Sequence, residues 1–154
     1  MRNVSKGTSK SRARIENLLE SKIIEADRNL VFSLTFEEEL PHISDMCDKI
    51  SVGYIDDVKR LGRVLLSCGY DPVLNIKGEI RGIDLSSDVS SKGPYSAVSV
   101  LKHNYHSLLR MIEYSKRLIN EDSIICFDRA IEELNRIILK DIETLVRIKE
   151  LISP

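Results

Sequence analysis

Apolar residues recur along this chain with the three- and four-residue spacing of helices. In the first 40 residues the repeating positions are Ile15, Leu19, Ile23, Ala26, Leu30 and Leu34. The most regular repeat comes last, at Phe127, Ala130, Ile131, Leu134, Ile138, Leu145, Ile148 and Ile152. Similar faces lie between these two, so the pattern predicts four amphipathic helices near residues 12–39, 42–68, 96–120 and 123–152.

Glycine and proline mark the ends of these predicted helices. Pro41 suits the first turn of the second helix, because the N–H that proline lacks would be unpaired there. Gly69 is placed to end that helix, and Gly93 and Pro94 precede the third. No glycine or proline occurs in residues 97–153, where Asp122 or Ser123 can cap a fourth helix.

The connections between the helices are short, long and short. Helices joined by a few residues must pack antiparallel, whereas the crossover of residues 69–95 is long enough to run back along the bundle. We therefore expect one all-α domain over residues 1–154, an up-down-down-up four-helix bundle whose second and third helices are parallel. Residues 1–11 form a basic tail, and the apolar part of the crossover, residues 73–85, is expected to cover part of the bundle.

The end of the second predicted helix, residues 65–72 (LLSCGYDP), resembles the leucine, glycine and proline stretch that often precedes the crossover in the ferritin-like superfamily. Helix lengths and the order of connections over residues 12–152 are similar as well. The resemblance implies a ferritin-like fold and non-haem diiron or dimanganese chemistry, or iron storage. Such a site takes a Glu from each of two helices and a Glu-x-x-His from each of the other two.

The sequence does not supply these ligands where the fold needs them. In the middle of the first helix, the apolar pattern places Ile23, Ala26 and Leu30 toward the centre of the bundle. On the second helix it places Asp56 and Asp57 toward solvent. The one Glu-x-x-His match, residues 39–42 (ELPH), contains Pro41 and falls between two helices. We expect no bound metal or cofactor and an apolar bundle centre, packed around Ile23, Leu30, Val58, Leu108, Leu134 and Ile138.

Two histidines are weak metal candidates. His103 and His106 stand three apart on the third predicted helix, a spacing that can ligate a transition metal on one helical face. Both lie far from the apolar face that contains Leu108, so the interpretation is that they are exposed. The first fourteen residues carry five Lys or Arg and no aromatic residue, which favours a solvated tail over one that binds phosphates.

Two polar residues fall among the inward positions, Asn104 on the third helix and Asp141 on the fourth. A buried carboxylate needs a hydrogen-bond donor, and a hairpin that turns near Asp122 brings position 104 level with about position 140. The prediction is a buried structural pair between Asp141 and Asn104 or Tyr105. A remnant of a metal site and a small-ligand pocket are the alternatives.

Charge and cysteine content limit the kinds of partner that the chain is expected to bind. The chain has 23 Lys and Arg against 24 Asp and Glu, so net charge selects neither nucleic acid nor a membrane surface. The longest apolar run is too short to span a bilayer. Three scattered cysteines, Cys47, Cys68 and Cys126, form no disulfide framework or zinc cluster, and we interpret Cys47 and Cys68 as small buried hydrophobes of a cytoplasmic protein.

Two functional classes follow. The first is a non-catalytic bundle that works as a homo-oligomer or binds a protein partner. It is indicated by a second line of apolar residues outside the core face, spaced by seven or multiples of seven along each helix: Ile24, Val31, Ile125, Leu139 and Val146. The second is a metal-dependent oxidoreductase or iron-storage protein whose ligands lie elsewhere. A small-ligand or nucleic-acid binder is a third hypothesis. The pattern favours the first class.

Overall fold

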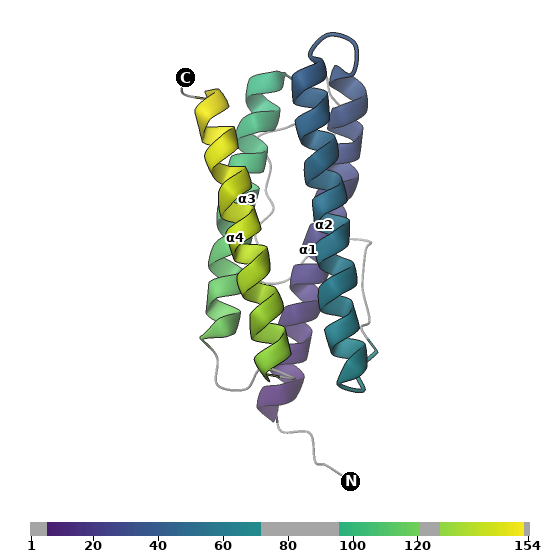
Figure 1. Cartoon of the computed structure of the whole chain (residues 1–154), viewed down its shortest axis with the longest axis vertical. Helices are drawn as coiled ribbons and strands as arrows, with labels where there is room; N and C mark the ends of the chain where they lie inside the picture. The colour runs from purple at the N-terminus through teal and green to yellow at the C-terminus, as the bar shows by residue number, and fades with distance from the viewer. Residues whose placement is uncertain (1–5, 72–95, 121–126, 153–154) are drawn as a thin grey trace.

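The computed structural model describes residues 6–71, 96–120 and 127–152, and in these residues the fold is all-helical (Figure 1). The four helices are α1 (Lys6–Phe36), α2 (Pro41–Ser67), α3 (Ala97–Ile119) and α4 (Phe127–Ile152). The predicted set of four long helices is therefore confirmed. The main difference is at α1, which begins six residues earlier than expected and ends at Phe36. The predicted crossover segment at residues 73–85 lies outside the described residues.

The helix ends follow from local hydrogen bonding. Pro41 occupies the first turn of α2, as the sequence predicts. After Ser67, the N–H of Gly69 donates to the Leu66 carbonyl and that of Tyr70 donates to the Leu65 carbonyl, both at 3.0 Å. This is a Schellman motif, which needs a residue with positive φ. Gly69 supplies it at φ 82°.

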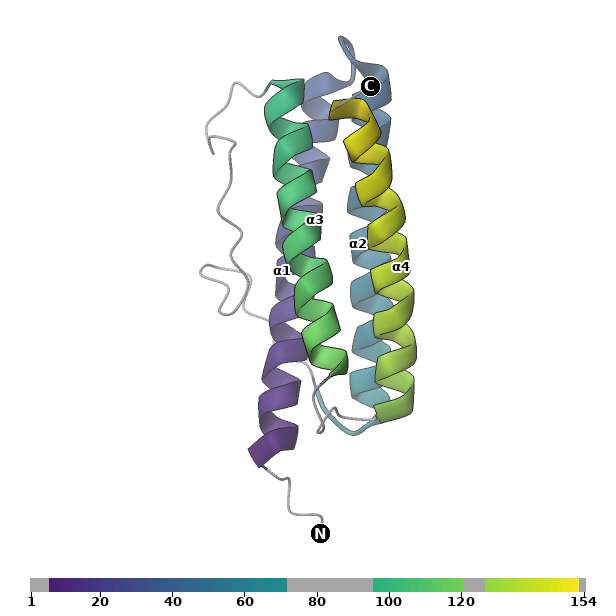
Figure 2. The same ribbon diagram turned by 90° about the vertical axis from the view of Figure 1, so that its left-hand side faces the viewer.

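The helices form two hairpins, α1 with α2 and α3 with α4, and Figure 2 shows them stacked so that α1 lies beside α3 and α2 beside α4. Along α1 and α2, Arg12 bonds the Asp71 carbonyl while Ser33 bonds Ser44, so these two helices run antiparallel. No described helix is both long enough and apolar enough to cross a membrane.

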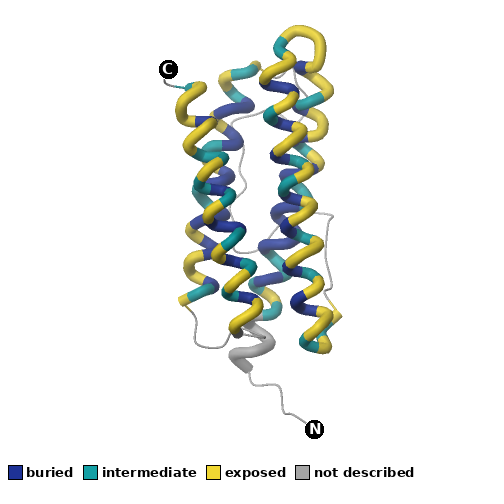
Figure 3. The backbone as a smooth tube through the Cα atoms, viewed as in Figure 1, coloured by how far each residue is buried: buried dark blue, intermediate teal, exposed yellow. Residues whose placement is uncertain are grey.

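The four helices alternate between buried and exposed positions along their length, as Figure 3 shows. The buried side chains are apolar toward the two ends of the bundle and include charged and amide groups in its middle. Of the predicted inward face of α1, Ile15, Leu19 and Ala26 are buried. A second series of buried side chains on α1 repeats at steps of three and four from Ile15: Leu18, Lys22, Glu25, Asn29, Phe32 and Phe36. This stripe is rotated from the apolar face that the sequence indicated. As a result, Leu30 is 47% exposed and Ile23 is half-buried.

The expected apolar core is therefore correct in part. Leu108, Leu134 and Ile138 are buried, and Val58 is half-buried against them. The expectation of a wholly apolar centre is wrong, because charged and amide side chains occupy the middle of the stripe. They can lie there because each finds hydrogen-bonding partners on other helices.

Candidate functional site

Lys22 is at the centre of the bundle. Its side chain is 1% exposed, and its ammonium nitrogen lies 2.9 Å from Asp57 Oδ2 on α2 and 2.7 Å from Asp141 Oδ2 on α4. The same nitrogen lies 4.7 Å from the centre of the Tyr54 ring. Burial by itself lowers the pKa of Lys22, but the charges of Asp141 and Asp57 outweigh burial and raise that pKa above its ordinary value. Lys22 therefore stays a cation in the folded protein.

Asp57 is the carboxylate with most partners. Besides Lys22 it accepts hydrogen bonds from Lys140 and, at 3.2 Å, from Arg136 Nη2, both on α4. Burial raises the pKa of Asp57, but the positive charges of Lys22 and Lys140 outweigh burial and lower it. Lys140 also donates to the Gly53 carbonyl at 2.9 Å. The sequence-based interpretation of Asp57 as a solvated residue is wrong, while Asp56 beside it is exposed as expected.

Asp141 is buried but incompletely paired. Lys22 occupies Oδ2, whereas Oδ1 has no hydrogen-bond partner in the described part of the chain. Burial raises the pKa of Asp141, and the neighbouring Lys22 opposes this without reversing it. The hydroxyl of Tyr54 is buried and also lacks a partner among the described residues. Burial, and then the charge of Asp141, raises the pKa of Tyr54 well above its ordinary value, so its hydroxyl keeps its proton.

A second polar cluster joins α1 to α3. The two carboxamides of Asn29 and Asn104 exchange hydrogen bonds of 3.0 and 2.8 Å. One turn away, Glu25 Oε2 lies 2.7 Å from His103 Nε2, and Glu25 Oε1 accepts a hydrogen bond of 3.0 Å from Arg28. These pairs connect the two hairpins on the side opposite to Lys140.

The predicted pair of Asn104 and Asp141 needs correction. Both side chains are buried, as expected. They do not bond each other, because Asn104 pairs with Asn29 and Asp141 pairs with Lys22. From the sequence, Asp141 is expected to bond a residue of α3, whereas in the structure it bonds Lys22 of α1. The third-helix residue offered as the other candidate partner, Tyr105, is half-buried and stacks edge-on against His106.

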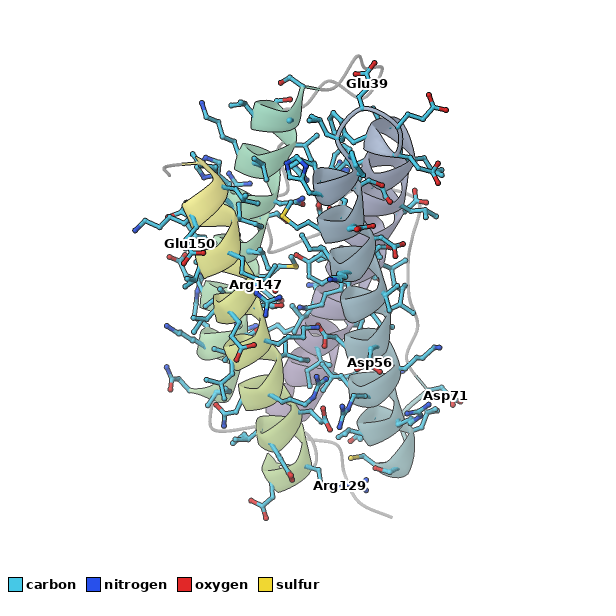
Figure 4. The ribbon with its side chains drawn as sticks, turned by 45° about the horizontal axis from the view of Figure 1, so that its top comes forward. Glu39, Asp56, Asp71, Arg129, Arg147 and Glu150 are labelled. Atoms are coloured by element: carbon cyan, nitrogen blue, oxygen red, sulfur yellow. The ribbon has the colours of Figure 1, made fainter. Side chains whose placement is uncertain are left out.

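The weak metal candidates separate in space. His103 is buried against Glu25, contrary to the expectation that it is exposed, while His106 is exposed. Glu39 lies at the turn between α1 and α2, as Figure 4 shows, and His42 in the first turn of α2 is exposed like it. Among the residues that the structure describes, no group of three or more His, Cys, Asp or Glu is arranged to hold a metal ion.

The cysteines differ from one another. Cys47 is a buried free thiol, as predicted, and burial raises its pKa to about 12. Cys68 instead takes part in a disulfide. The prediction that Cys68 is a simple buried hydrophobe is therefore wrong. Because disulfides are uncommon in a reducing cytosol, the cytoplasmic location stays a prediction that this bond does not favour.

The predicted partner surface is exposed where it is described. Val31, Leu139 and Val146 are exposed, and Ile24 is half-buried. Ile125, the remaining member of the line, and Cys126 lie outside the described residues, as do residues 1–5 of the predicted basic tail. The prediction of a tail over residues 1–11 is wrong for residues 6–11, because these belong to α1.

Sequence reasoning missed Lys22, Glu25 and Asn29 as inward residues. Their signal was the three-and-four spacing that they share with the buried Ile15, Leu18 and Phe32. That spacing was obscured because the more apolar residues of α1, such as Leu30 and Leu34, point to solvent.

The comparisons with known proteins return no relative. No protein-family model, no curated protein and no solved structure matches this chain. The functional argument therefore rests on the geometry of the site.

Proposed function

We propose that this protein is a non-catalytic four-helix bundle that works by binding a protein partner or a second copy of itself. The observation that carries the proposal is the position of Lys22, whose ammonium nitrogen lies within 2.9 Å of Asp57 and Asp141 at the bundle centre. A dimetal centre needs carboxylates to compensate the charge of its ions. Here the lysine cation takes that compensation, and a metal ion beside it would meet electrostatic repulsion.

The ferritin-like, up-down-down-up connectivity is part of the same proposal. It is supported by residue pairs that run in opposite directions along α1 and α3, namely Arg14 with Tyr114 and Asn29 with Asn104. The pairs Ser67 with Arg129 and Gly53 with Lys140 do the same along α2 and α4. With α1 antiparallel to α2, these directions agree with a long crossover between α2 and α3.

The surface of α4 supports the binding role. Leu139 and Val146 lie two helical turns apart on the side away from the core, and they are 65% and 50% exposed. Val31 on α1 is a further exposed apolar residue. A second copy or a partner helix that covers this line would remove apolar surface from water.

One observation favours the metal-dependent alternative. Each helix contributes at least one buried side chain of a type that ligates metals, among them Glu25, Asp57, His103 and Asp141. In the structure these groups are already engaged, His103 with Glu25 and the two aspartates with Lys22. The alternative requires that Lys22 leave the centre.

The metal content of the purified protein separates the two functions. We expect less than stoichiometric iron and manganese after purification without chelators, and no saturable heat of binding when Mn²⁺ is titrated into the protein. A Lys59→Gln variant, which changes an exposed lysine, should show the same metal content and the same heat of Mn²⁺ binding as the unmodified protein. The Lys22→Gln variant tests whether the central lysine excludes the metal. Stoichiometric metal in the unmodified protein would support the metal-dependent alternative.

Sedimentation equilibrium tests the binding surface. If the protein pairs with itself through α4, the double variant Leu139→Glu, Val146→Glu should shift it to the monomer. Val52→Glu is the matched control, because Val52 is equally exposed but lies on α2. A monomer at all concentrations directs the search to a different partner, and a dimer unaffected by the double variant contradicts this surface.

A further inference from the structure

A cavity of about 620 Å³ lies between α2 and α4, beside the Lys22 cluster. Its size is within the range of small-molecule sites. Apolar side chains form part of its wall, including Met46, Ile50 and Leu151, and Tyr54 and Asp141 are among its polar residues. In Figure 4, Arg147 marks the α4 side of this space. The cavity shares Asp141 with the metal-ligating types named above, and it shares no residue with the exposed line of Leu139 and Val146 on α4.

The two unpaired polar atoms of the cluster both belong to residues that line this cavity. Tyr54 Oη and Asp141 Oδ1 are buried, and neither has a hydrogen-bond partner among the described residues. Buried polar atoms in folded proteins are almost always paired with protein, water or ligand. Two residues in the wall of one cavity that each carry such an atom are expected of a site that orients a ligand.

The hydrogen-bonding capacity of the two atoms defines their complement. Lys22 donates to Asp141 Oδ2, and Oδ1, which has no partner among the described residues, can accept a hydrogen bond. The Tyr54 hydroxyl keeps its proton, because burial and the neighbouring carboxylates disfavour the phenolate, so it can donate. A ligand hydroxyl satisfies both atoms at once, since it donates one hydrogen bond and accepts another.

The charges around the cavity select against a charged ligand. Apart from His42, three basic residues are matched by three acidic ones: Lys49, Lys140 and Arg147 against Asp45, Asp141 and Glu150. A ligand carboxylate would be repelled by Asp141. An ammonium group could donate to Asp141, but it offers no acceptor to Tyr54 and would stand near Lys22.

We propose that the cavity between α2 and α4 binds an uncharged, largely apolar small molecule whose single hydroxyl bridges Tyr54 Oη and Asp141 Oδ1. The apolar body of the ligand packs against Met46, Ile50 and Leu151. This site goes beyond the proposed protein-binding function and does not depend on it, because the exposed line of α4 and the cavity use different residues.

Phenol and anisole are the matched probes, since anisole replaces the hydroxyl hydrogen by a methyl group and cannot donate. Each is titrated into the ¹⁵N-labelled full chain and followed by heteronuclear NMR. We expect phenol to shift the amide signals of Ile50, Gly53 and Thr144, and to bind about tenfold more tightly than anisole, which is the effect of one hydrogen bond to a charged acceptor.

Variants assign the contacts. Tyr54→Phe removes the donor to the ligand oxygen and should weaken phenol about tenfold, whereas Tyr105→Phe, on α3 and outside the cavity, should change the binding of neither probe. Asp141→Asn is the second test, and it should reduce the preference for phenol over anisole, because only phenol can donate a hydrogen bond to Asp141.

The comparison of the two probes needs no variant, so the proposal remains testable even if one of these variants fails to fold. Equal affinity for phenol and anisole, or no response of the cavity signals to either, would overturn it. Phenol binding that Tyr54→Phe does not weaken would overturn it as well. None of these outcomes depends on the oligomeric state or on metal content.

Discussion

The two hairpins of this bundle are joined along two seams that differ in chemistry. Along the α1–α3 seam, Asn29 and Asn104 exchange two hydrogen bonds, and Glu25 bonds His103. Along the α2–α4 seam, Asp57 bonds Arg136 and Lys140, and a cavity opens next to these charges. Lys22 of α1 reaches across to the second seam through both of its carboxylate partners.

The difference shows two ways to bury polar groups. A reciprocal carboxamide pair is neutral and satisfies its own donors and acceptors in one fixed register. An ion cluster needs several charges from three helices, and here it leaves Asp141 Oδ1 unpaired. The first seam is therefore suited to fixing the register of the helices, and the second is suited to accepting a ligand.

The largest effect should come from removing Lys22. Lys22→Met removes the cation that bonds Asp141 and should lower the free energy of unfolding by about 3–5 kcal/mol, because it leaves a buried carboxylate without its hydrogen-bonded partner. Urea denaturation measures this. Lys59→Met, at an exposed position of α2, is the control and should change stability by less than about 0.5 kcal/mol.

The double variant Lys22→Met, Asp141→Leu sharpens this result. It removes the Asp141 carboxylate that Lys22→Met leaves unpaired, while Asp57 keeps its bonds to Lys140 and Arg136. Most of the lost stability should return, since apolar replacements of buried ion pairs are often neutral. If the double variant instead loses as much stability as the two single variants together, Lys22 does not stabilise Asp141.

The α1–α3 seam should respond more weakly. Asn29→Leu or Asn104→Leu alone should cost about 1–3 kcal/mol, because the remaining carboxamide is left unpaired, while the double variant should recover most of this loss. A double-mutant cycle by urea denaturation measures the coupling. The same cycle between Asn104 and Asp141 should be close to additive, because the structure gives them separate partners. Strong coupling between these two would contradict the separation of the seams.

Alkaline pH should weaken the packing beside the second seam. The unfolded chain ionises Cys47 at its ordinary pKa of 9.0, whereas burial raises the pKa in the folded protein to about 12. The folded state therefore holds the proton more tightly, and its contribution to stability is lost as pH rises from 9 toward 12. The expected slope from this thiol is up to about 1.4 kcal/mol per pH unit.

Urea midpoints between pH 8 and pH 11 measure that slope. Cys47→Ala should lower stability at pH 8 but flatten the dependence on pH. The raised pKa of Tyr54 acts in the same direction, so Tyr54→Phe should also flatten the alkaline loss. An unchanged slope in both variants would mean that neither group titrates differently on unfolding.

The smallest effect on stability is expected at the outer face of α4. Leu139→Ser should change the free energy of unfolding by less than about 0.5 kcal/mol, because the side chain is 65% exposed. Thermal denaturation at low protein concentration measures this for the monomer. A loss that appears only at high concentration would indicate that Leu139 is buried between copies.

Much of the fold could be predicted because helix formation depends on local pattern. The apolar period, Pro41 and Gly69 placed four helices and the end of α2 close to where the structure has them. Burial of Asn104 and Asp141 was also predictable, because apolar neighbours flank both residues on the helix face.

The sequence by itself thus determined that the chain forms four long helices and that polar groups enter the bundle on α3 and α4. Only the tertiary structure decided which face of α1 is buried and which residues bond there. The physical reason is that Lys22, Glu25 and Asn29 are too polar to be buried alone, and become stable inside only when paired. Their partners Asp57, His103, Asn104 and Asp141 lie 35 to 119 positions away along the chain, beyond the reach of any local pattern.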